Sequence, residues 1–396
     1  MILSDVCEFI VDCPHSTAPD EGEGYPLIRT PNVGKGRLDL NGVHRVSESV
    51  YKQRIQRGAP RANDLIFARE APAGNVALVQ ENQTVCLGQR TVLIRPNVQK
   101  VNPQYLVYYL LSPKPQYELL GTANGATVAH VNLPAIRNLK IELPEKSVQD
   151  KIGTILVTYD NLIENNQKQI KLLEEAVQRL YKEWFVDLRF PGHENTKIVD
   201  GVPEGWNWCK LEDAIQFDPK VTLTKERMKQ FIPMSALSTS SMVLDESQFT
   251  ETTSNSGSKF QNGDTLLARI TPCLENGKTA YVSGLKSSEG AVGSTEYIVM
   301  RAKTINAYMV YLLARTDDFR QSAINSMSGS DGRQRVKSDK LKMLDYLHPT
   351  SELVEKFENV EEPIFEKIYR LSKQMQQAKQ ARDLLLPKLM SGEVEV

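Results

Sequence analysis

The stretch NDLIFARE, residues 63–70, returns further along the chain as GDTLLARI, residues 263–270. Each copy sets an aspartate before a short, largely apolar run and an arginine after it. That pattern predicts a turn, a core strand, and a cation where the strand ends. Alternation within the strand predicts four buried side chains, those of Leu65, Phe67, Leu266 and Ala268.

The repeat continues beyond this stretch at nearly the same spacing. Tyr105 and Tyr108 match Tyr308 and Tyr311, and residues 131–144 match residues 336–349. The same offset then runs through a long polar-apolar segment in each half. A fixed repeat of this kind is read first as architecture. It predicts a tandem repeat in which each copy is a globular domain followed by a long helix.

Each globular half reads as a mixture of strands and helix. Strands are expected in DLIFARE, NVALVQE and RTVLIRP, and in DTLLARI, KTAYVSG and EYIVMRA. One helix follows in each half, NPQYLVYYLLS at 102–112 and NAYMVYLLARTDDF at 306–319. A glycine-rich loop and a short strand, IRNLKIELP or LKMLDYLHP, then close the domain at a proline.

The segment after each proline is predicted to be one long helix with a narrow apolar seam. The first seam runs through positions 148, 152, 155, 159, 162, 170, 173, 177, 180 and 184, and the second through 353, 357, 360, 364, 368, 371, 375, 378, 385 and 389. Two such seams favour pairing with each other, with Asn166 fixing the register. Pro363 is expected to break or kink the second helix. A simple spacer or a homodimer zipper is the alternative.

The predicted fold class is therefore α+β, with two mixed α/β domains in a tandem pseudo-twofold repeat. Two long helices, pairing as an antiparallel coiled coil, separate the domains. The expected boundaries are 1–144 for the first domain, 145–190 for the first helix, 191–349 for a linker and the second domain, and 350–396 for the second helix and tail.

Bulk composition narrows the class of protein. The 48 Lys and Arg against 49 Asp and Glu give a net charge of −1, so any nucleic-acid surface must be a local patch. Five cysteines form no CxxC pair and leave one odd, which favours a reduced cytoplasm over a disulfide framework. The acidic N-terminal segment does not resemble a signal peptide, and no apolar run is long enough to span a membrane.

Motifs that would signal catalysis are weak or missing. NPQY, residues 102–105, resembles a box that holds the target amino group in adenine methyltransferases. It also fits a helix cap, with Asn102 as N-cap and Pro103 at the first helical position. The second half keeps only Asn306, which favours the cap. Neither a P-loop nor zinc-ligand spacing among the five histidines is found, so the chain is expected to be non-catalytic.

Candidate binding residues cluster in loops. NGATVAH contributes Thr127 and His130, and GSDGRQR contributes Arg333, Gln334 and Arg335, together with free backbone amides. Arginine suits phosphate or guanine edges, and glutamine suits adenine. Further candidate DNA contacts are Lys35 and Arg37 of GKGR, Arg69 and Arg269 at the strand ends, Lys278, and Lys337. An ordinary hairpin or lid loop, or a solvated turn at GKGR, remains the alternative.

Three longer stretches carry a family resemblance: DTLLARITPCLENGKTA at 264–280, VPEGWNWCKLEDA at 202–214, and the ending LLLPKLMSGEVEV. With the order of domains and helices, they resemble the DNA specificity subunit of type I restriction–modification systems across the whole chain. Pro363 and Pro387 in the second helix, and LPEKSVQDKI without a second proline, depart from that pattern.

The resemblance implies two target recognition domains, each reading one half of a split site on double-stranded DNA in the major groove. It implies helices that set the gap and dock two methyltransferase subunits for adenine-N6 methylation. S-adenosylmethionine would belong to those partners, and ATP and Mg²⁺ to motor–nuclease subunits where present. The alternatives are a specificity subunit of another methylation-based defence system and a coiled-coil adaptor without a DNA role.

Overall fold

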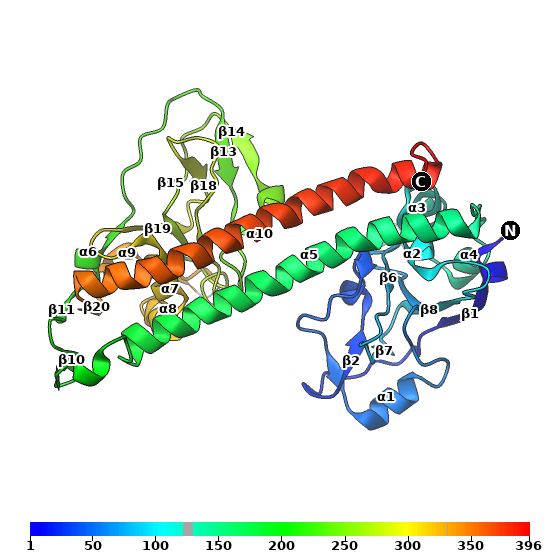
Figure 1. The fold of residues 1–396 in the computed structure, drawn as a ribbon, viewed down its shortest axis with the longest axis horizontal. Helices are drawn as coiled ribbons and strands as arrows, with labels where there is room; N and C mark the ends of the chain where they lie inside the picture. The colour runs from blue at the N-terminus through cyan, green and yellow to red at the C-terminus, as the bar shows by residue number, and fades with distance from the viewer. Residues whose placement is uncertain (122–129, 331) are drawn as a thin grey trace. The chain divides into compact units, whose positions relative to one another are not determined.

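The computed structural model describes residues 1–121, 130–330 and 332–396. The chain forms two compact units, Met1–Asn165 with Met375–Val396, and Asn166–Gln374. Each unit contains one mixed domain and the parts of two long helices, α5 (Lys146–Tyr181) and α10 (Ser351–Ser391), that pack on it (Figure 1). The two units are described separately.

The first unit is built on two sheets. The larger has the strand order β1-β8-β5-β6-β3 and the smaller the order β4-β2-β7. The strands are β1 (Cys7–Asp12), β2 (Tyr25–Ile28), β3 (Gly36–Arg37), β4 (Arg45–Val46), β5 (Leu65–Ala68), β6 (Val76–Leu78), β7 (Cys86–Leu87) and β8 (Thr91–Pro96). The helices of this domain are α1 (Glu48–Arg54), α2 (Pro103–Leu111), α3 (Pro113–Gly121) and α4 (Leu133–Arg137).

The second unit repeats this plan with two four-stranded sheets, β12-β19-β16-β17 and β14-β13-β18-β15, beside the pairs β9-β10 and β11-β20. Its strands are β9 (Ile198–Val199), β10 (Val202–Pro203), β11 (Asn207–Lys210), β12 (Ile215–Phe217), β13 (Lys229–Ile232), β14 (Thr250–Thr252), β15 (Ser258–Phe260), β16 (Thr265–Ala268), β17 (Thr279–Tyr281), β18 (Ala291–Gly293), β19 (Tyr297–Ala302) and β20 (Asp345–His348). Its shorter helices are α6 (Leu211–Ala214), α7 (Ala307–Arg315), α8 (Asp317–Asn325) and α9 (Ser338–Lys342).

Strand pairing confirms the repeat read from the sequence. β5 lies between β8 and β6 in antiparallel pairing, as β16 lies between β19 and β17. β2 runs parallel to β7, as β13 runs parallel to β18. The six strands predicted for the two cores are present, and so is the closing strand of the second half, β20. The local pattern of short apolar runs was a sufficient signal for the six core strands.

Two predicted elements differ from the structure. The single helix expected over 306–319 is divided at Thr316, whose hydroxyl accepts a hydrogen bond from the Phe319 amide and caps α8. The strand expected over 136–144 is instead the end of α4 followed by one isolated bridge between Ile2 and Lys140. Both changes come from side-chain or long-range backbone partners that the local pattern does not show.

The repeated strand is buried on both of its faces. The four β5 residues are fully enclosed, with Leu65 and Phe67 in one apolar cluster and Ile66 and Ala68 in another. In β16, Leu267 and Leu266 likewise belong to different clusters. The four predicted core residues are buried, but the strand lies between two cores. This explains why nearly every position of the stretch is apolar.

The aspartate before each strand is a buried anchor. Asp64 accepts two hydrogen bonds from Arg95, at 2.8 and 2.7 Å, and Asp264 accepts two from Arg301, at 2.6 and 2.7 Å. Both carboxylates are almost fully enclosed. A bidentate arginine–carboxylate pair ties the turn to the neighbouring strand, β8 or β19, in each unit.

The long helices pair antiparallel within each unit. In the first, buried Asp160 of α5 accepts hydrogen bonds from Tyr108 of α2 and Arg382 of α10, both at 2.5 Å. In the second, Asn166 lies 3.5 Å from the Leu371 carbonyl, while Trp184 packs on Phe357. The predicted seam position of Asn166 is therefore confirmed.

Other seam positions are displaced. The buried line of α5 runs through Leu156, Asp160, Ile163 and Glu174, whereas Leu162 is exposed. Two carboxylates on this line, Asp160 and Glu174, are bonded to groups of the neighbouring domain. A search for apolar residues alone could not find Asp160 and Glu174, because their burial depends on hydrogen bonds to the neighbouring domain.

The expected break at Pro363 is wrong, because α10 is one helix from Ser351 to Ser391. Proline removes one backbone donor, which leaves the Asn359 carbonyl without its usual helical partner. Pro363 and Asn359 are both exposed, so water can serve that carbonyl, while Phe357, Phe365 and Ile368 fix the helix by packing. Pro387 is accommodated in the same helix.

The helix-cap interpretation of NPQY is confirmed. The Asn102 side chain accepts a hydrogen bond from the Tyr105 amide at 3.1 Å, and Asn306 does the same for Met309 at 2.8 Å. Both asparagines satisfy one of the free amides of the first helical turn. Their shared role is structural, which explains why the second copy needs no proline.

Candidate nucleic-acid interface

In both units the residue that closes the glycine-rich segment, Val131 or Val336, is bonded to the arginine that ends the repeated strand. The Val131 amide donates to the Arg69 carbonyl at 3.0 Å, and the Val336 amide donates to the Arg269 carbonyl at 2.9 Å. The predicted arginine and the predicted loop residue of each half are thus brought together. Side chains around these two junctions form what we call the first clamp and the second clamp.

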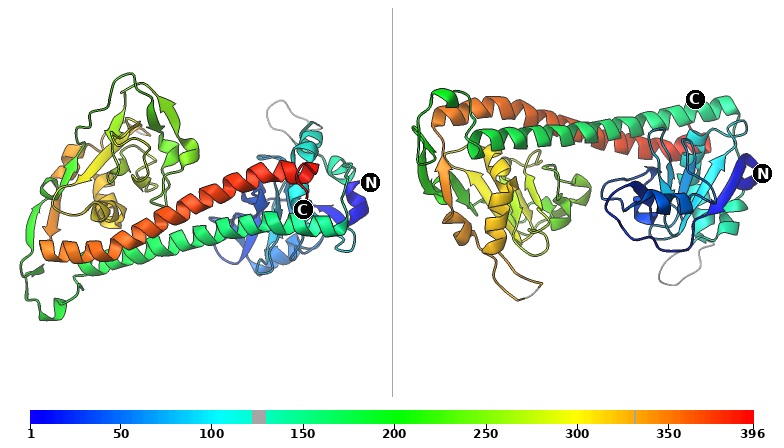
Figure 2. Two further views of the ribbon diagram at one scale, coloured as in Figure 1. Left: turned by 45° about the horizontal axis from the view of Figure 1, so that its top comes forward. Right: turned by 90° about the horizontal axis from the view of Figure 1, so that it is seen from below.

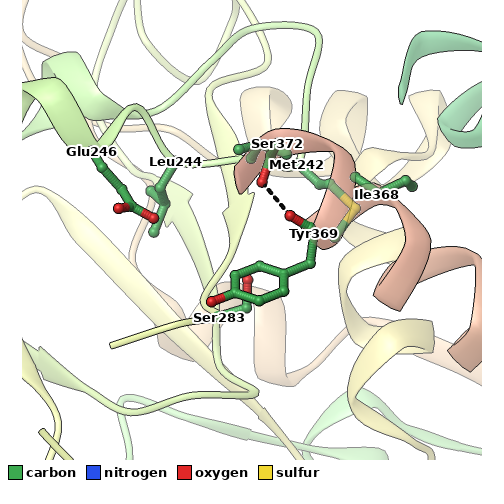
Figure 3. A pocket seen from close by; sticks show the side chains of 8 residues that line it. Met242, Leu244, Glu246, Ser283, Ile368, Tyr369 and Ser372 are labelled. Carbon is green, nitrogen blue, oxygen red and sulfur yellow. Dashed lines mark hydrogen bonds between the residues drawn. The ribbon is translucent and has the colours of Figure 1, made fainter. Parts of the chain in front are cut away.

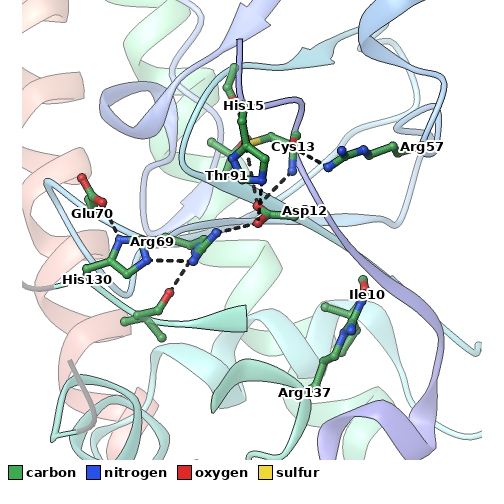
Figure 4. Close-up of polar contacts among 12 residues, drawn as sticks. Ile10, Asp12, Cys13, His15, Arg57, Arg69, Glu70, Thr91, His130 and Arg137 are labelled. Atoms are coloured by element: carbon green, nitrogen blue, oxygen red, sulfur yellow. Dashed lines mark hydrogen bonds and ion pairs between the residues drawn. The ribbon is translucent and has the colours of Figure 1, made fainter. Parts of the chain in front are cut away.

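The first clamp consists of Asp12, Arg69, Glu70, Arg90 and His130. Figure 4 shows Asp12, Arg69, Glu70 and His130. Arg69 donates to Asp12 at 2.6 Å, to the Val131 carbonyl at 2.9 Å and to Nε2 of His130 at 2.7 Å. His130 binds Glu70 through Nδ1, and Glu70 also pairs with Arg90 at 2.9 Å. The whole guanidinium of Arg69 is therefore engaged inside the protein.

Hydrogen bonding assigns the state of His130. Because Nε2 accepts from an arginine, the proton lies on Nδ1, which donates to Glu70, and the imidazole is neutral. Arg69 and Arg90 then stand against Asp12 and Glu70. The positive and negative charges of the first clamp are therefore equal in number. Arg69 is buried, so it stabilises the fold of its unit and is not available to a ligand.

The second clamp consists of Arg269, Glu296 and Arg335. Arg335 donates from Nε and Nη2 to the Glu296 carboxylate at distances of 2.7–3.0 Å, and from Nη1 to the Arg333 carbonyl at 3.3 Å. The Arg335 guanidinium, and more weakly that of Arg269, hold the pKa of Glu296 below its ordinary value. Arg335 occupies the place of His130, one residue before the closing valine.

Arg269 differs from its counterpart Arg69, because no described residue forms a hydrogen bond or salt bridge with its side chain. Its Nε is buried and makes no hydrogen bond to any residue in the described ranges. The side chain as a whole is partly exposed. Two arginines thus face one carboxylate, and the second clamp carries a net positive charge.

The residues beyond the second clamp are the most accessible of those predicted. Arg333 and Lys337 are exposed, and residues 326–330 and 332–337, between α8 and α9, project from the body of their unit (Figure 2, right). The amides of Arg333 and Arg335 bond to Ser330 and Ser328, and the Gln334 carbonyl accepts from Thr271. The expectation of free amides at Arg333 and Arg335 is therefore wrong, because the loop closes on itself as a hairpin.

The remaining candidates have other surroundings. Lys35 is exposed, but Arg37 donates to Asn161 of α5 at 2.5 Å and lies 4.0 Å from Glu164. Lys278 donates to the Met234 carbonyl at 3.0 Å. Arg37 and Lys278 therefore support internal contacts. Thr127 lies outside the described residues.

Four residues of the clamps were not predicted: Asp12, Glu70, Arg90 and Glu296. Arg90 and Glu296 occupy equivalent places, since β5 pairs Ala68 with Thr91 and β16 pairs Ala268 with Tyr297. The repeat could have found this pair, because both residues directly precede a matched strand. Asp12 carries no such signal in the sequence.

A small pocket in the second unit is lined by α10 and the segment around Met242 (Figure 3). Its volume of about 10 Å³ holds no more than about one water molecule, so it cannot accept a nucleotide. Within residues 1–121, 130–330 and 332–396, no cluster of three His, Cys, Asp or Glu side chains could ligate a metal. In those same ranges no helix has the length and apolarity to cross a bilayer.

Comparison with known proteins gives a consistent answer. Residues 1–175 match the family model of the type I restriction modification DNA specificity domain. The chain is similar to the MjaIX specificity subunit of Methanocaldococcus jannaschii, with 27% identity over 90% of this chain and 83% of that protein. It is also similar to the EcoAI specificity subunit of Escherichia coli, with 30% identity over 54% of this chain and 37% of that protein. The chain is therefore similar to the specificity subunits of type I restriction–modification systems, and its first 175 residues match their DNA specificity domain.

The fold agrees with this family. A crystal structure of the type I S subunit from M. genitalium aligns with a TM-score of 0.59 over 98% of this chain and 95% of that chain, at 13% identity. At that identity the likeness concerns the fold alone. The tandem mixed domains and the long helices are thus a fold that this chain shares with a type I S subunit.

Proposed function

We propose that this specificity subunit reads a bipartite DNA target, one half with each globular domain. The observation that carries the proposal is the pair of clamps. Their backbone framework is the same, because in each the arginine carbonyl accepts a hydrogen bond from the amide of the closing valine. Apart from that arginine, the side chains of the two clamps differ. A constant framework with different exposed chemistry is suited to two unlike half-sites.

The exposed chemistry of the second loop fits the major groove. Arg333 can donate two hydrogen bonds to guanine or one to a phosphate, and Lys337 can contact phosphate. The chain is nearly neutral overall, so we expect DNA to contact the local positive charge of this loop rather than a generally basic surface. Two unlike readers in one polypeptide recognise an asymmetric sequence with a fixed gap.

Methylation would be performed by partner subunits. Adenine-N6 transfer requires the base to leave the stack and enter a pocket on an enzyme. We propose that two methyltransferase subunits, which bring S-adenosylmethionine, dock on the long helices, and that motor–nuclease subunits bring ATP and Mg²⁺ for restriction. Exposed apolar side chains on these helices, Leu162 and Leu384 in the first unit and Leu172 and Val360 in the second, support such docking.

Replacing Leu172 by lysine should weaken capture of the methyltransferase subunit by about 10-fold or more, a loss of roughly 1–2 kcal/mol. The side chain is 64% exposed, so the fold does not need it. Co-purification and titration of the two subunits measure the effect. Gln167→Lys, which adds the same charge at another exposed position of α5, is the matched control and should bind normally.

Arg333→Ala should impair one half-site and leave the other recognised. The expected loss is roughly 1–3 kcal/mol of discrimination if the side chain contacts a base. Mapping methylated adenines across the genome of a host that carries the complete system measures it. Lys340→Ala, an exposed cation on α9, is the control. Methylation unchanged at both halves would remove this loop from the reading surface, and a host without methylated adenines would refute the function.

A further inference from the structure

The arginines that end the two copies of the repeated strand are placed alike but partnered differently. The backbone carbonyl of each arginine accepts a hydrogen bond from the amide of the closing valine, Val131 or Val336. Arg69 is buried and makes three side-chain hydrogen bonds, to Asp12, His130 and the Val131 carbonyl. Arg269 makes none within the described parts of the chain, although its Nε is enclosed.

An unpaired donor on a partly buried guanidinium is costly, because the charged group has lost water without gaining a hydrogen bond in exchange. Glu296, a carboxylate whose charge interacts with Arg269, is hydrogen-bonded through both of its oxygens to Arg335. No described residue pairs with the Arg269 side chain through a hydrogen bond or salt bridge, although the charge of Glu296 acts on it. Such an arrangement is stabilised when an anion from outside reaches the end of β16.

We propose that Arg269 binds a backbone phosphate of the DNA half-site read by the second domain, whereas Arg69 has become a framework residue. This inference rests on the proposed DNA-reading function and adds an asymmetry to it. The clamp behind the second reading loop supplies a phosphate contact, and the clamp of the first domain, which is balanced in charge, supplies none.

Glu296 has a supporting part in this arrangement. By binding Arg335 on both carboxylate oxygens, it keeps that guanidinium against the loop stem, where Arg335 also donates to the Arg333 carbonyl. Arg335 is then a positioning residue for the loop, and Arg269 is the cation left free for the phosphate. A phosphate contact fixes the register of a protein on the duplex without reading its sequence.

The salt dependence of DNA binding tests this inference. The full chain, with its partner subunits bound, is titrated onto a duplex containing its methylated target over a series of potassium chloride concentrations. Each phosphate contact contributes about 0.9 to the slope of log affinity against log salt. Arg269→Gln should make that slope less steep by about one and should not lower the melting temperature, because it removes a charge that no described residue pairs with.

Arg69→Gln is the matched variant at the equivalent position. It should keep the wild-type salt slope and lower the melting temperature, because it breaks the internal bonds of the first clamp. Arg269→Lys, which keeps the charge, should retain the wild-type slope. An unaltered slope in Arg269→Gln, or an equal reduction in Arg69→Gln, overturns the inference while DNA reading stands. Wild-type complex that fails to bind the duplex overturns both.

Discussion

Replacing Asp264 by alanine is expected to lower the free energy of unfolding of the second unit by about 3–5 kcal/mol. The carboxylate is enclosed and receives both hydrogen bonds of the Arg301 fork, and a third from the Gln261 amide at 2.8 Å. Removing one member of a buried ion pair leaves the other charged and without a partner, which is the costly case. The turn that leads into β16 would lose its anchor at the same time.

Urea unfolding followed by tryptophan fluorescence measures this effect. All three tryptophans, Trp184, Trp206 and Trp208, belong to the second unit, so their signal reports on the unit that carries the substitution. Asp345→Ala is the control. Its partner Lys210 is as close, at 2.7 Å, but both side chains are exposed, so the loss should stay below about 1 kcal/mol. Equal losses in the two variants would contradict the role given to Asp264.

The sequence repeat made most of the fold predictable, because the strands it marks are recognised from short runs of neighbouring apolar residues. The six core strands and the two asparagine caps follow from residues that are neighbours in sequence. Helix continuity at Pro363 did not follow, because the local preference of proline is overridden by packing on either side of it. Helix propensity is a weak guide where an apolar face is already fixed.

The candidate site was less predictable for a different reason. Arg69 and Arg269 lie in nearly the same local sequence, and no neighbouring residue distinguishes them. Their difference comes from Asp12 on β1 and from Arg335, which takes the only carboxylate of the second clamp. The chemistry of each arginine is set by strands and loops far away in the chain. The repeated stretch therefore predicts where each arginine lies and not what it binds.

A buried acid on α10 should make the stability of the second unit depend on pH. Glu361 is fully enclosed, and neither carboxylate oxygen has a hydrogen-bond partner among the described residues. Burial raises the pKa of Glu361 to about 8, despite the opposing effect of Asn306 and with a small contribution from Glu358. Tyr181, Tyr281 and Tyr308 are the other titratable groups around it.

The sign follows from proton binding. Between the ordinary value of 4.5 and about 8, the folded state holds a proton on Glu361 that the unfolded state has lost. Stability contributed by the neutral acid is therefore complete below the lower value and declines as the pH rises towards the higher one. The total decline from this group is about 5 kcal/mol at most.

Glu361→Gln should remove this dependence, since an amide of the same shape cannot ionise. At about pH 5 the variant and the wild type should unfold at similar urea concentrations, and at about pH 9 the variant should be more stable by several kcal/mol. Glu358→Gln, one turn earlier on the same helix, should behave nearly as the wild type does. If the variant and the wild type lose stability in parallel over this range, Glu361 is ionised in the folded protein. In that case the Asn306 amide, which faces it, must supply the missing bond.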